Sequence, residues 1–320
     1  MEAKRYKVGE GMPTESLRSK FLGCLLGVAI GDALGASREG RGMASKGEVE
    51  SLAEKLSWLT YTDDTHMTIG VPQSLVDSQG FDGEHMAQTF IRNYEAEPWR
   101  GYGPGPPRIF RMIKAGEPWN RAGSKLYGGG SFGNGSAMRV APIGLLYGDH
   151  PAELREIACQ SSLITHCHQL GKEGAALEAY AVALATNTPP DREVDPEVFI
   201  QQLHNFIQHP RYRQKIACIG ELLAEEDRVR VVSVLGNGVE ALRSVPTAIY
   251  SFLRHPKSYE DSVLYPISLG GDTDTIAAMA GAISGAYLGV EAIPHRWRAK
   301  LENRAYIEAL AEELWQLTVS

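Results

Sequence analysis

Glycine recurs at every fourth residue in two stretches, one near each end of the chain. The two sets are Gly23, Gly27, Gly31 and Gly35, then Gly281, Gly285 and Gly289. A spacing of four places each set on one face of a helix. Because glycine inside a helix costs about 1 kcal/mol relative to alanine, several in register indicate that another backbone approaches that face closely. We therefore expect two glycine-lined helices that cross at the centre of the domain; flexible glycine-rich loops are the alternative.

The remaining patterns are mainly helical. Residues 151–164 carry an apolar stripe, and residues 170–186 are rich in alanine and leucine, as in a central helix. A C-terminal stripe contains Leu301, Ile307, Leu310, Leu314 and Leu317. Runs that alternate with a period of two are rare, so a large sheet is not expected. The sequence predicts one all-α domain over residues 1–320, with a polar N-terminal segment at 1–13 and a surface loop at 187–196.

Composition narrows the choice of compartment and partner. The chain has 320 residues, with 39 acidic against 32 basic side chains and a formal charge of -7. This balance argues against a nucleic-acid backbone as the main partner, although a small phosphorylated ligand remains compatible with it. Four scattered cysteines without a Cys-x-x-Cys pair indicate reduced thiols and a cytoplasmic, intracellular protein.

The apolar run at residues 21–31 imitates the core of a secretory signal. Twenty mostly polar residues precede it, however, and Asp32 interrupts it. The run is also too short to span a bilayer as a helix. We interpret it as a buried helix, and we expect neither a targeting segment nor a membrane partner.

Two acidic clusters stand out, one at residues 62–65 (Thr-Asp-Asp-Thr) and one at residues 270–275 (Gly-Gly-Asp-Thr-Asp-Thr). Each precedes an apolar helical run, so either cluster alone could be only a helix cap. Four carboxylates exceed what two caps need, and an oxygen-only set suits hard divalent ions such as Mg²⁺ or Mn²⁺. If the clusters meet in space, a two-metal centre follows, because the carboxylates would repel one another without cations.

Two glycine-rich stretches lie between the acidic clusters. They are residues 100–105 (Arg-Gly-Tyr-Gly-Pro-Gly) and residues 128–135 (Gly-Gly-Gly-Ser-Phe-Gly-Asn-Gly). Glycine before a helix exposes backbone N–H groups that can cradle phosphate, although such loops are often simple turns. Tyr102 and Phe132 could stack on a base or form the wall of a sugar pocket. His166 could cap the helix before it, and neither a Walker loop nor a dinucleotide-binding Gly-x-Gly-x-x-Gly occurs.

Together these motifs resemble the ADP-ribosylglycohydrolase family, which includes the dinitrogenase-reductase-activating glycohydrolases. The matching segments are residues 31–35 (Gly-Asp-Ala-Leu-Gly), 62–65, 133–135, 137–139 (Ala-Met-Arg), 165–166 (Thr-His) and 270–275. The loop at 101–105, and Glu39 seven residues after Asp32, are most similar to the branch that removes ADP-ribose from serine. That branch also cleaves poly(ADP-ribose) and O-acetyl-ADP-ribose. The resemblance implies a compact orthogonal helical domain with two Mg²⁺ or Mn²⁺ ions in a central cleft.

The resemblance also implies roles for individual residues. One ion would be held by Thr62, Asp63, Asp64 and a shared Asp274, and the other by Asp272, Asp274 and Thr275. Glu39 matches the family's mobile glutamate near the scissile bond, and Asp64 would orient water, so these two are the expected catalytic residues. The expected substrate-binding residues are Gly101, Gly103, Gly105, Gly130, Ser131, Phe132, Gly133, Asn134 and His166.

Three positions depart from the family pattern. Phe132 replaces a tyrosine that stacks on adenine, which should preserve stacking but removes a hydroxyl. His66 and Ser136 replace commoner small residues. These changes bear on specificity more than on the reaction.

The expected function is hydrolysis at the anomeric carbon of the distal ribose in ADP-ribosylated protein, poly(ADP-ribose) or O-acetyl-ADP-ribose. The protein is expected to be a monomer. Three alternatives remain open. The chain could bind ADP-ribose without cleaving it, or it could hydrolyse arginine-linked ADP-ribose. An isoprenoid-diphosphate enzyme would also be helical and aspartate-rich, but it usually carries Asp-Asp-x-x-Asp, and position 67 is methionine.

Overall fold

The computed structural model describes residues 8, 9 and 11–319, so most of the predicted polar segment at 1–13 lies outside the described residues. The first part of the chain forms α1 (Thr14–Gly35), the 3₁₀-helix η1 (Ala36–Arg38), α2 (Lys46–Lys55), α3 (Asp63–Asp77), α4 (Gly83–Ala96), α5 (Gly105–Lys114) and α6 (Trp119–Leu126). The middle forms α7 (Ala141–Leu146), α8 (Pro151–Ser162), α9 (Gln169–Asn187), α10 (Pro196–Phe206), α11 (Pro210–Leu222) and α12 (Arg228–Leu235). The last part forms α13 (Ala241–Arg254), α14 (Tyr259–Ser268), α15 (Thr273–Leu288), η2 (Val290–Ala292), α16 (His295–Arg298) and α17 (Arg304–Val319).

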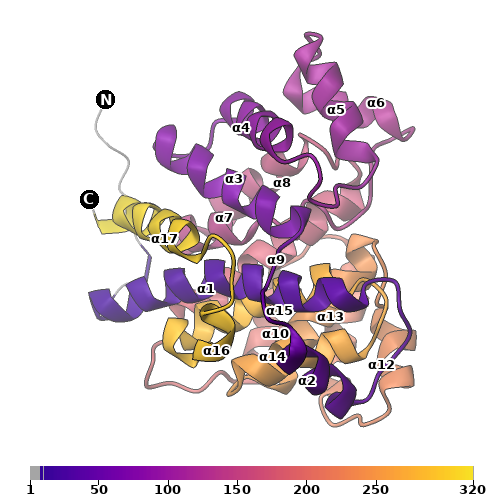
Figure 1. Cartoon of the computed structure of the whole chain (residues 1–320), viewed down its shortest axis with the longest axis vertical. Helices are drawn as coiled ribbons and strands as arrows, with labels where there is room; N and C mark the ends of the chain where they lie inside the picture. The colour runs from indigo at the N-terminus through magenta and orange to yellow at the C-terminus, as the bar shows by residue number, and fades with distance from the viewer. Residues whose placement is uncertain (1–7, 10, 320) are drawn as a thin grey trace.

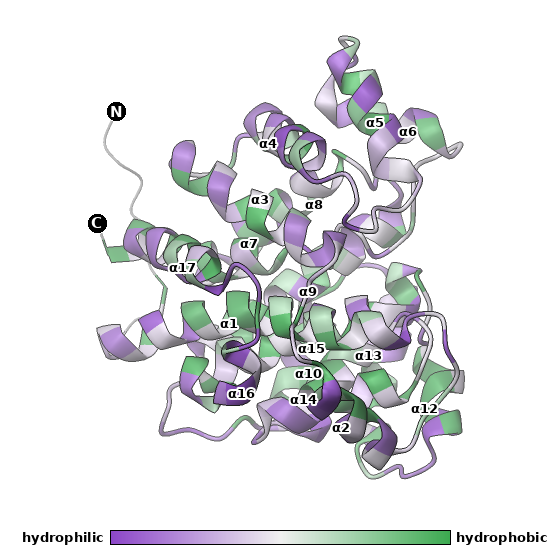
Figure 2. Cartoon of the chain, in the orientation of Figure 1, coloured by the Kyte–Doolittle hydropathy of each residue, from purple (hydrophilic) through white to green (hydrophobic). Residues whose placement is uncertain are grey.

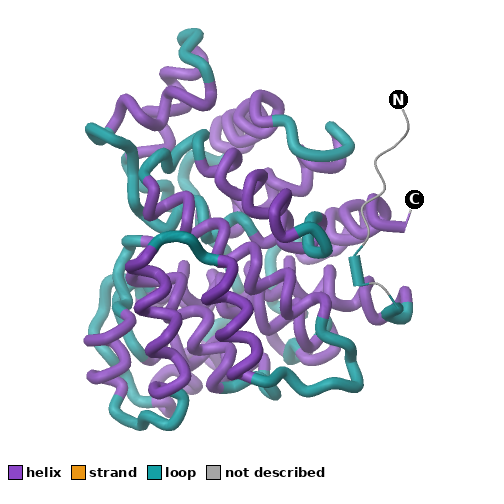
Figure 3. Tube along the Cα trace, turned by 180° about the vertical axis from the view of Figure 1, so that it is seen from behind, coloured by secondary structure: helices purple, strands orange, loops and turns teal. Residues whose placement is uncertain are grey.

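The fold is an all-helical domain, as predicted. Between residues 8 and 319, the described part of the chain contains no strand, only isolated bridges that pair Leu59 with Leu301 and Gly133 with Glu240. Figure 3 shows helices joined by loops throughout. The predicted segments 151–164 and 170–186 correspond to α8 and α9. The C-terminal stripe is shorter than predicted, because Leu301 lies before α17 in the bridge to Leu59.

Helices α1 and α15 form the centre of the domain (Figure 1). A Cβ added to Gly27 would lie 2.2 Å from the carbonyl oxygen of Gly281, and one added to Gly23 would lie 2.4 Å from that of Gly285. Further along, Gly31 meets Ala277 and Gly35 meets Thr273 in the same way. The contact predicted from the glycine spacing is confirmed. The helices run antiparallel in this register over several turns, however, and do not cross at one point.

Helix α1 carries many apolar residues (Figure 2), and most of its residues are buried. Among the described residues 8–319 it is the one helix with the length and hydropathy of a membrane span. Of its most apolar 18-residue stretch, 89% is buried inside the protein. It packs on α15, α17 and α9. The buried-helix interpretation of residues 21–31 is therefore confirmed.

The segment between α9 and α10 is a surface loop. The buried Lys20 ammonium donates to the carbonyl oxygens of Ala185 and Thr186 at the end of α9. The Tyr287 hydroxyl accepts from the Val194 N–H at 3.0 Å. These contacts fix both ends of the loop to the central helices.

Candidate active site

The antiparallel pair places the end of α1 beside the start of α15. A Cβ on Gly35 would lie 2.5 Å from the Cα of Asp274, and the Thr273 hydroxyl donates to the Gly35 carbonyl oxygen at 2.8 Å. The segment after η1 is held to the same place by backbone pairing. The Gly40 N–H donates to the Gly271 carbonyl, and the Gly271 N–H donates to that of Arg41. Glu39 is thereby fixed next to residues 272–275.

Asp32 joins the other acidic cluster to α1. This carboxylate is completely buried and accepts hydrogen bonds from the backbone N–H and hydroxyl groups of both Thr62 and Thr65. It therefore caps α3 from a different helix. Asp32 was not among the predicted site residues, although a carboxylate that interrupts an apolar run is a signal in the sequence.

The two predicted acidic clusters meet. Oxygen atoms of Asp32, Asp64 and Asp274 lie within 4.8 Å of one another, and so do oxygen atoms of Glu39, Asp272 and Asp274. Asp274 belongs to both groups. Asp63 belongs to neither, but it lines the same cavity.

The state of these carboxylates fits cation binding. Oδ1 of Asp64 is buried without a hydrogen-bond partner. Burial, with added repulsion from Asp32, raises the pKa of Asp63 to about 7. Burial and the charge of Asp272 raise the pKa of Asp274 to about 9, and burial also raises the pKa of Asp64 and Asp272. A set of buried oxygen ligands that repel one another is suited to hard divalent cations.

A cavity of about 360 Å³ opens above the acidic groups. The predicted residues that line it are Glu39, Thr62, Asp63, Asp64, Gly101, Gly103, Gly105, Ser131, Gly133, Asn134, His166, Asp272, Asp274 and Thr275. Gly130 and Phe132 are not among the lining residues. Gly130 packs on Cys167 and His168, and the Phe132 ring is 48% exposed with its edge against His168. Tyr127, which was not among the predicted site residues, supplies an aromatic ring to the wall.

The second glycine-rich loop is anchored on both sides of the cavity. The Asn134 side-chain amide donates to Oδ2 of Asp272, and its backbone N–H donates to the Val239 carbonyl at 2.9 Å. The Ala241 N–H donates to the Phe132 carbonyl at 3.1 Å. The loop thus connects the acidic residues with the start of α13.

A sequence model of the ADP-ribosylglycohydrolase family matches residues 13–320. The chain belongs to this family. It is 38% identical to the ADP-ribosylhydrolase ARH3 of Mus musculus, over 92% of this chain and 91% of the mouse protein. Identity to ARH3 of Homo sapiens is 37%, over 92% of this chain and 93% of the human protein. A solved structure described as an ADP-ribosylglycohydrolase-related protein complex superposes with a TM-score of 0.73 at 27% identity, over 95% of this chain and 99% of that chain.

Within the ADP-ribosylglycohydrolase family the chain is an ADP-ribosylhydrolase of the ARH3-like branch, and its buried aspartates are consistent with metal binding in that family. These findings confirm the family and branch drawn from the motifs. They leave the linkage, the metal and the individual site residues as predictions.

The imidazole of His166 is neutral and lines the cavity of this ADP-ribosylglycohydrolase. Burial lowers the pKa of its imidazole to about 3, and Arg139 adds to the effect. The Thr165 hydroxyl accepts from Arg139 at 2.9 Å and lies 2.7 Å from Nδ1 of His166. A threonine hydroxyl can donate one hydrogen bond and accept two, so Thr165 joins the Arg139 guanidinium to Nδ1 of His166 and holds the imidazole in place. Nε2 faces Gly133 and Gly135, which also line the cavity.

His66, one of the departures from the family pattern, supports the first glycine-rich loop. Its Nδ1 lies 2.9 Å from the Tyr102 hydroxyl, and the two rings meet edge to face. Tyr102 also packs edge to face on Tyr94. The larger side chain thus ties the loop at 101–105 to α3, the helix that begins with Asp63 and Asp64.

The raised pKa values predict an unusual pH dependence for metal-free protein. Each of these carboxyl groups has a higher pKa in the folded protein than in the unfolded chain, where the pKa is near 3.8. Its contribution to stability is complete below pH 3.8 and is lost as the pH rises through the pKa of the folded protein. The Tm in EDTA should therefore fall between pH 6 and about 9. Divalent cations bind the ionised form, so the rise in Tm on adding Mn²⁺ should grow over the same range. Parallel curves with and without Mn²⁺ in a thermal-shift series would contradict this.

Proposed function

We propose that this protein is a metal-dependent hydrolase that releases ADP-ribose from serine-linked adducts, poly(ADP-ribose) or O-acetyl-ADP-ribose. The bond cleaved is the one at the anomeric carbon of the distal ribose. The observation that carries the proposal is the meeting of Asp32, Asp64, Asp272 and Asp274, the last three of which line a cavity together with residues of two glycine-rich loops. The ARH3 relatives, which are named ADP-ribosylhydrolases, support the substrate class.

The chain supplies a cation site in which Asp64 and Asp272 belong to separate carboxylate groups that share Asp274. Bound Mg²⁺ or Mn²⁺ would neutralise these carboxylates, orient the ribose hydroxyls and lower the pKa of a water. Asp64 is buried at the bottom of the cavity, where its unpaired Oδ1 can accept a hydrogen bond from that water.

The first glycine-rich loop provides the donors for the diphosphate. The backbone N–H groups of Gly101, Tyr102 and Gly103 make no hydrogen bond within the described part of the protein. Gly101 has a φ of +85°, a conformation that glycine adopts without strain. Neither it nor Gly103 has a side chain to keep a phosphate away, so successive N–H groups can face the anion directly.

Glu39 is the carboxylate best placed for the scissile bond. It is exposed at the rim of the cavity, while its oxygen lies within 4.8 Å of those of Asp272 and Asp274. It can therefore reach both the solvent side, where the acceptor would leave, and the buried acidic groups. Hydrolysis through an oxocarbenium-like transition state needs a carboxylate at this place, either to protonate the leaving oxygen or to activate water.

Replacing Glu39 with glutamine should leave ADP-ribose binding within about twofold while reducing turnover by about 10²–10⁴-fold, the usual contribution of a general acid or base. Binding is measured by calorimetry and turnover by release of ADP-ribose. Glu50→Gln, in the surface helix α2, is the matched control and should be fully active. An unchanged turnover in Glu39→Gln would remove Glu39 from the reaction.

The function is tested with a substrate panel of serine-linked, arginine-linked and polymeric ADP-ribose, each with Mg²⁺, Mn²⁺ or EDTA. The proposal expects release from serine and polymer with either metal and none with EDTA. Cleavage of the arginine adduct alone would show that the enzyme hydrolyses an N-glycosidic bond. Binding of ADP-ribose without release from any adduct would make the protein a binding module.

A further inference from the structure

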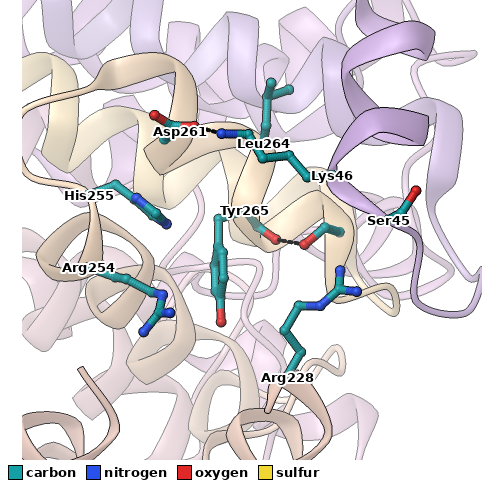
Figure 4. A pocket seen from close by; sticks show the side chains of 9 residues that line it. Ser45, Lys46, Arg228, Arg254, His255, Asp261, Leu264 and Tyr265 are labelled. Carbon is teal, nitrogen blue, oxygen red and sulfur yellow. Dashed lines mark hydrogen bonds and ion pairs between the residues drawn. The ribbon is translucent and has the colours of Figure 1, made fainter. Parts of the chain in front are cut away.

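A second cavity, of about 280 Å³, adjoins the segment that carries Glu39. Ser45 and Ser268 form part of its wall (Figure 4). The preceding residue, Ala44, donates its N–H to the Ser268 carbonyl at 3.0 Å, and Ser268 lies four residues before Asp272. This cavity shares no lining residue with the catalytic one.

The lining of the second cavity has an excess of positive charge in a protein of net charge -7. Lys46, Arg228 and Arg254 line it, and Asp261 is the only carboxylate among the lining residues. Asp261 pairs with Lys46 at 2.7 Å. Within residues 8–319 as described, neither arginine has a carboxylate oxygen within ion-pair distance.

Both arginines keep unused donors. Arg228 donates through one nitrogen, Nη1, to the Ala44 carbonyl oxygen. Arg254 likewise uses only Nη1, which donates to the Leu223 carbonyl at 2.8 Å and to the Tyr250 hydroxyl at 3.2 Å. A guanidinium has five N–H groups in a planar fork, so most donors of both residues remain for a ligand.

Tyr265 lies between the two arginines, with its hydroxyl directed toward the space that separates them (Figure 4). That hydroxyl has one long contact, 3.5 Å to Tyr250. Burial is the main effect that raises its pKa, so it stays protonated and can donate. The Arg254 guanidinium lies 5.5 Å from the centre of the Tyr265 ring. With Leu264, this ring makes an apolar wall that strengthens charge interactions.

We infer that this cavity binds a single phosphate group between Arg228 and Arg254, with the Tyr265 hydroxyl as a further donor and Lys46 at the exposed side. Donors from four helices, α2, α12, α13 and α14, line this one cavity, and such a set suits a tetrahedral anion with several acceptor oxygens better than a planar carboxylate with two. Because Arg228 contacts the Ala44 carbonyl, the phosphate would lie near Ala44, which is five residues after Glu39.

The test is a calorimetric titration of inorganic phosphate into protein saturated with ADP-ribose and Mg²⁺, so that the catalytic cavity is filled. We expect the wild type to bind one phosphate per chain. Arg254→Met should bind phosphate at least about tenfold more weakly, because the variant loses charge-assisted hydrogen bonds to the anion. Arg228→Met should have the same effect. The Arg254 variant leaves the Arg228–Ala44 contact intact and is the decisive one if Arg228→Met unfolds.

Arg230→Met is the matched control, because Arg230 lies on α12, the helix that carries Arg228. Its side chain is exposed, and its Nε lies 3.3 Å from Oε2 of Glu225. It should bind phosphate as the wild type does. Absence of phosphate binding in the saturated wild type, or equal affinity in wild type and Arg254→Met, would overturn the inference. If ADP-ribose itself does not bind, the proposed function fails, and the comparison of variants with phosphate alone still decides the second site.

The phosphate group could be a free ion or part of a longer substrate, and a kinetic arm separates these sources. This arm rests on the proposed function. If polymer phosphates occupy the site, Arg254→Met should raise KM for poly(ADP-ribose) several-fold and leave KM for serine-linked ADP-ribose unchanged. If the occupant is free phosphate, both KM values should stay as in the wild type while the calorimetric loss persists.

Discussion

Asp274→Ala is expected to reduce metal-dependent release of ADP-ribose by at least about three orders of magnitude, equivalent to about 4 kcal/mol of transition-state stabilisation. Asp274 is the carboxylate common to both acidic groups, one with Asp32 and Asp64 and the other with Glu39 and Asp272. Its loss would therefore impair both cation sites at once. Initial rates at several Mn²⁺ concentrations, up to saturation, measure the effect.

The same variant separates a catalytic role from a structural one. Burial and neighbouring carboxylates oppose ionisation of Asp274, so its removal should leave the metal-free protein at pH 8 at least as stable as the wild type. Asp82→Ala is the matched control, because Asp82 caps α4 away from the cavity. It should lose about 1 kcal/mol of stability and keep full activity. Wild-type turnover by Asp274→Ala would refute the shared-ligand assignment.

Gly27→Ala is expected to destabilise the fold by about 3 kcal/mol or more, at the upper end of the cost of overpacking. The new methyl group would lie 2.2 Å from the Gly281 carbonyl oxygen, which is backbone and cannot rotate away. Alanine favours the helix by about 1 kcal/mol relative to glycine. The net loss of stability therefore requires that the steric clash cost more than this gain. Denaturant unfolding of both proteins, with Mn²⁺ present, measures the difference.

Gly47→Ala provides the opposite expectation at another helical glycine. A Cβ at Gly47, in α2, would have no atom within 4 Å. The substitution should leave stability unchanged or raise it by up to about 1 kcal/mol. Equal effects at Gly27 and Gly47 would show that the backbone contact between α1 and α15 does not limit side-chain size.

The central pair and the acidic site could be predicted because their signals are local. Glycines four residues apart on one helix face require a close neighbour, and only the second glycine set offered one. The aspartates at 63–64 and 272–274 carry more charge than two helix caps need. The sequence could not give the antiparallel register, since that depends on which turns of the two helices face each other.

Other parts of the site depend on contacts between distant segments. Asp32 acts through hydrogen bonds to Thr62 and Thr65, thirty or more residues away. Tyr127 reaches the cavity wall through the path of a loop, and Phe132, five residues later, turns toward His168. The cations of the second cavity come from three separate helices, and each alone resembles an ordinary surface residue. Such contacts between distant segments cannot be predicted from the periodicity of the sequence.

The central claim is that the two acidic segments hold two divalent ions together, and a crystal grown with Mn²⁺ tests it most directly through anomalous scattering. The account predicts two manganese peaks in the cleft, both in contact with Asp274, with Asp64 on one and Asp272 on the other. A map with no peak between the two segments, at a Mn²⁺ concentration that supports turnover, would contradict it.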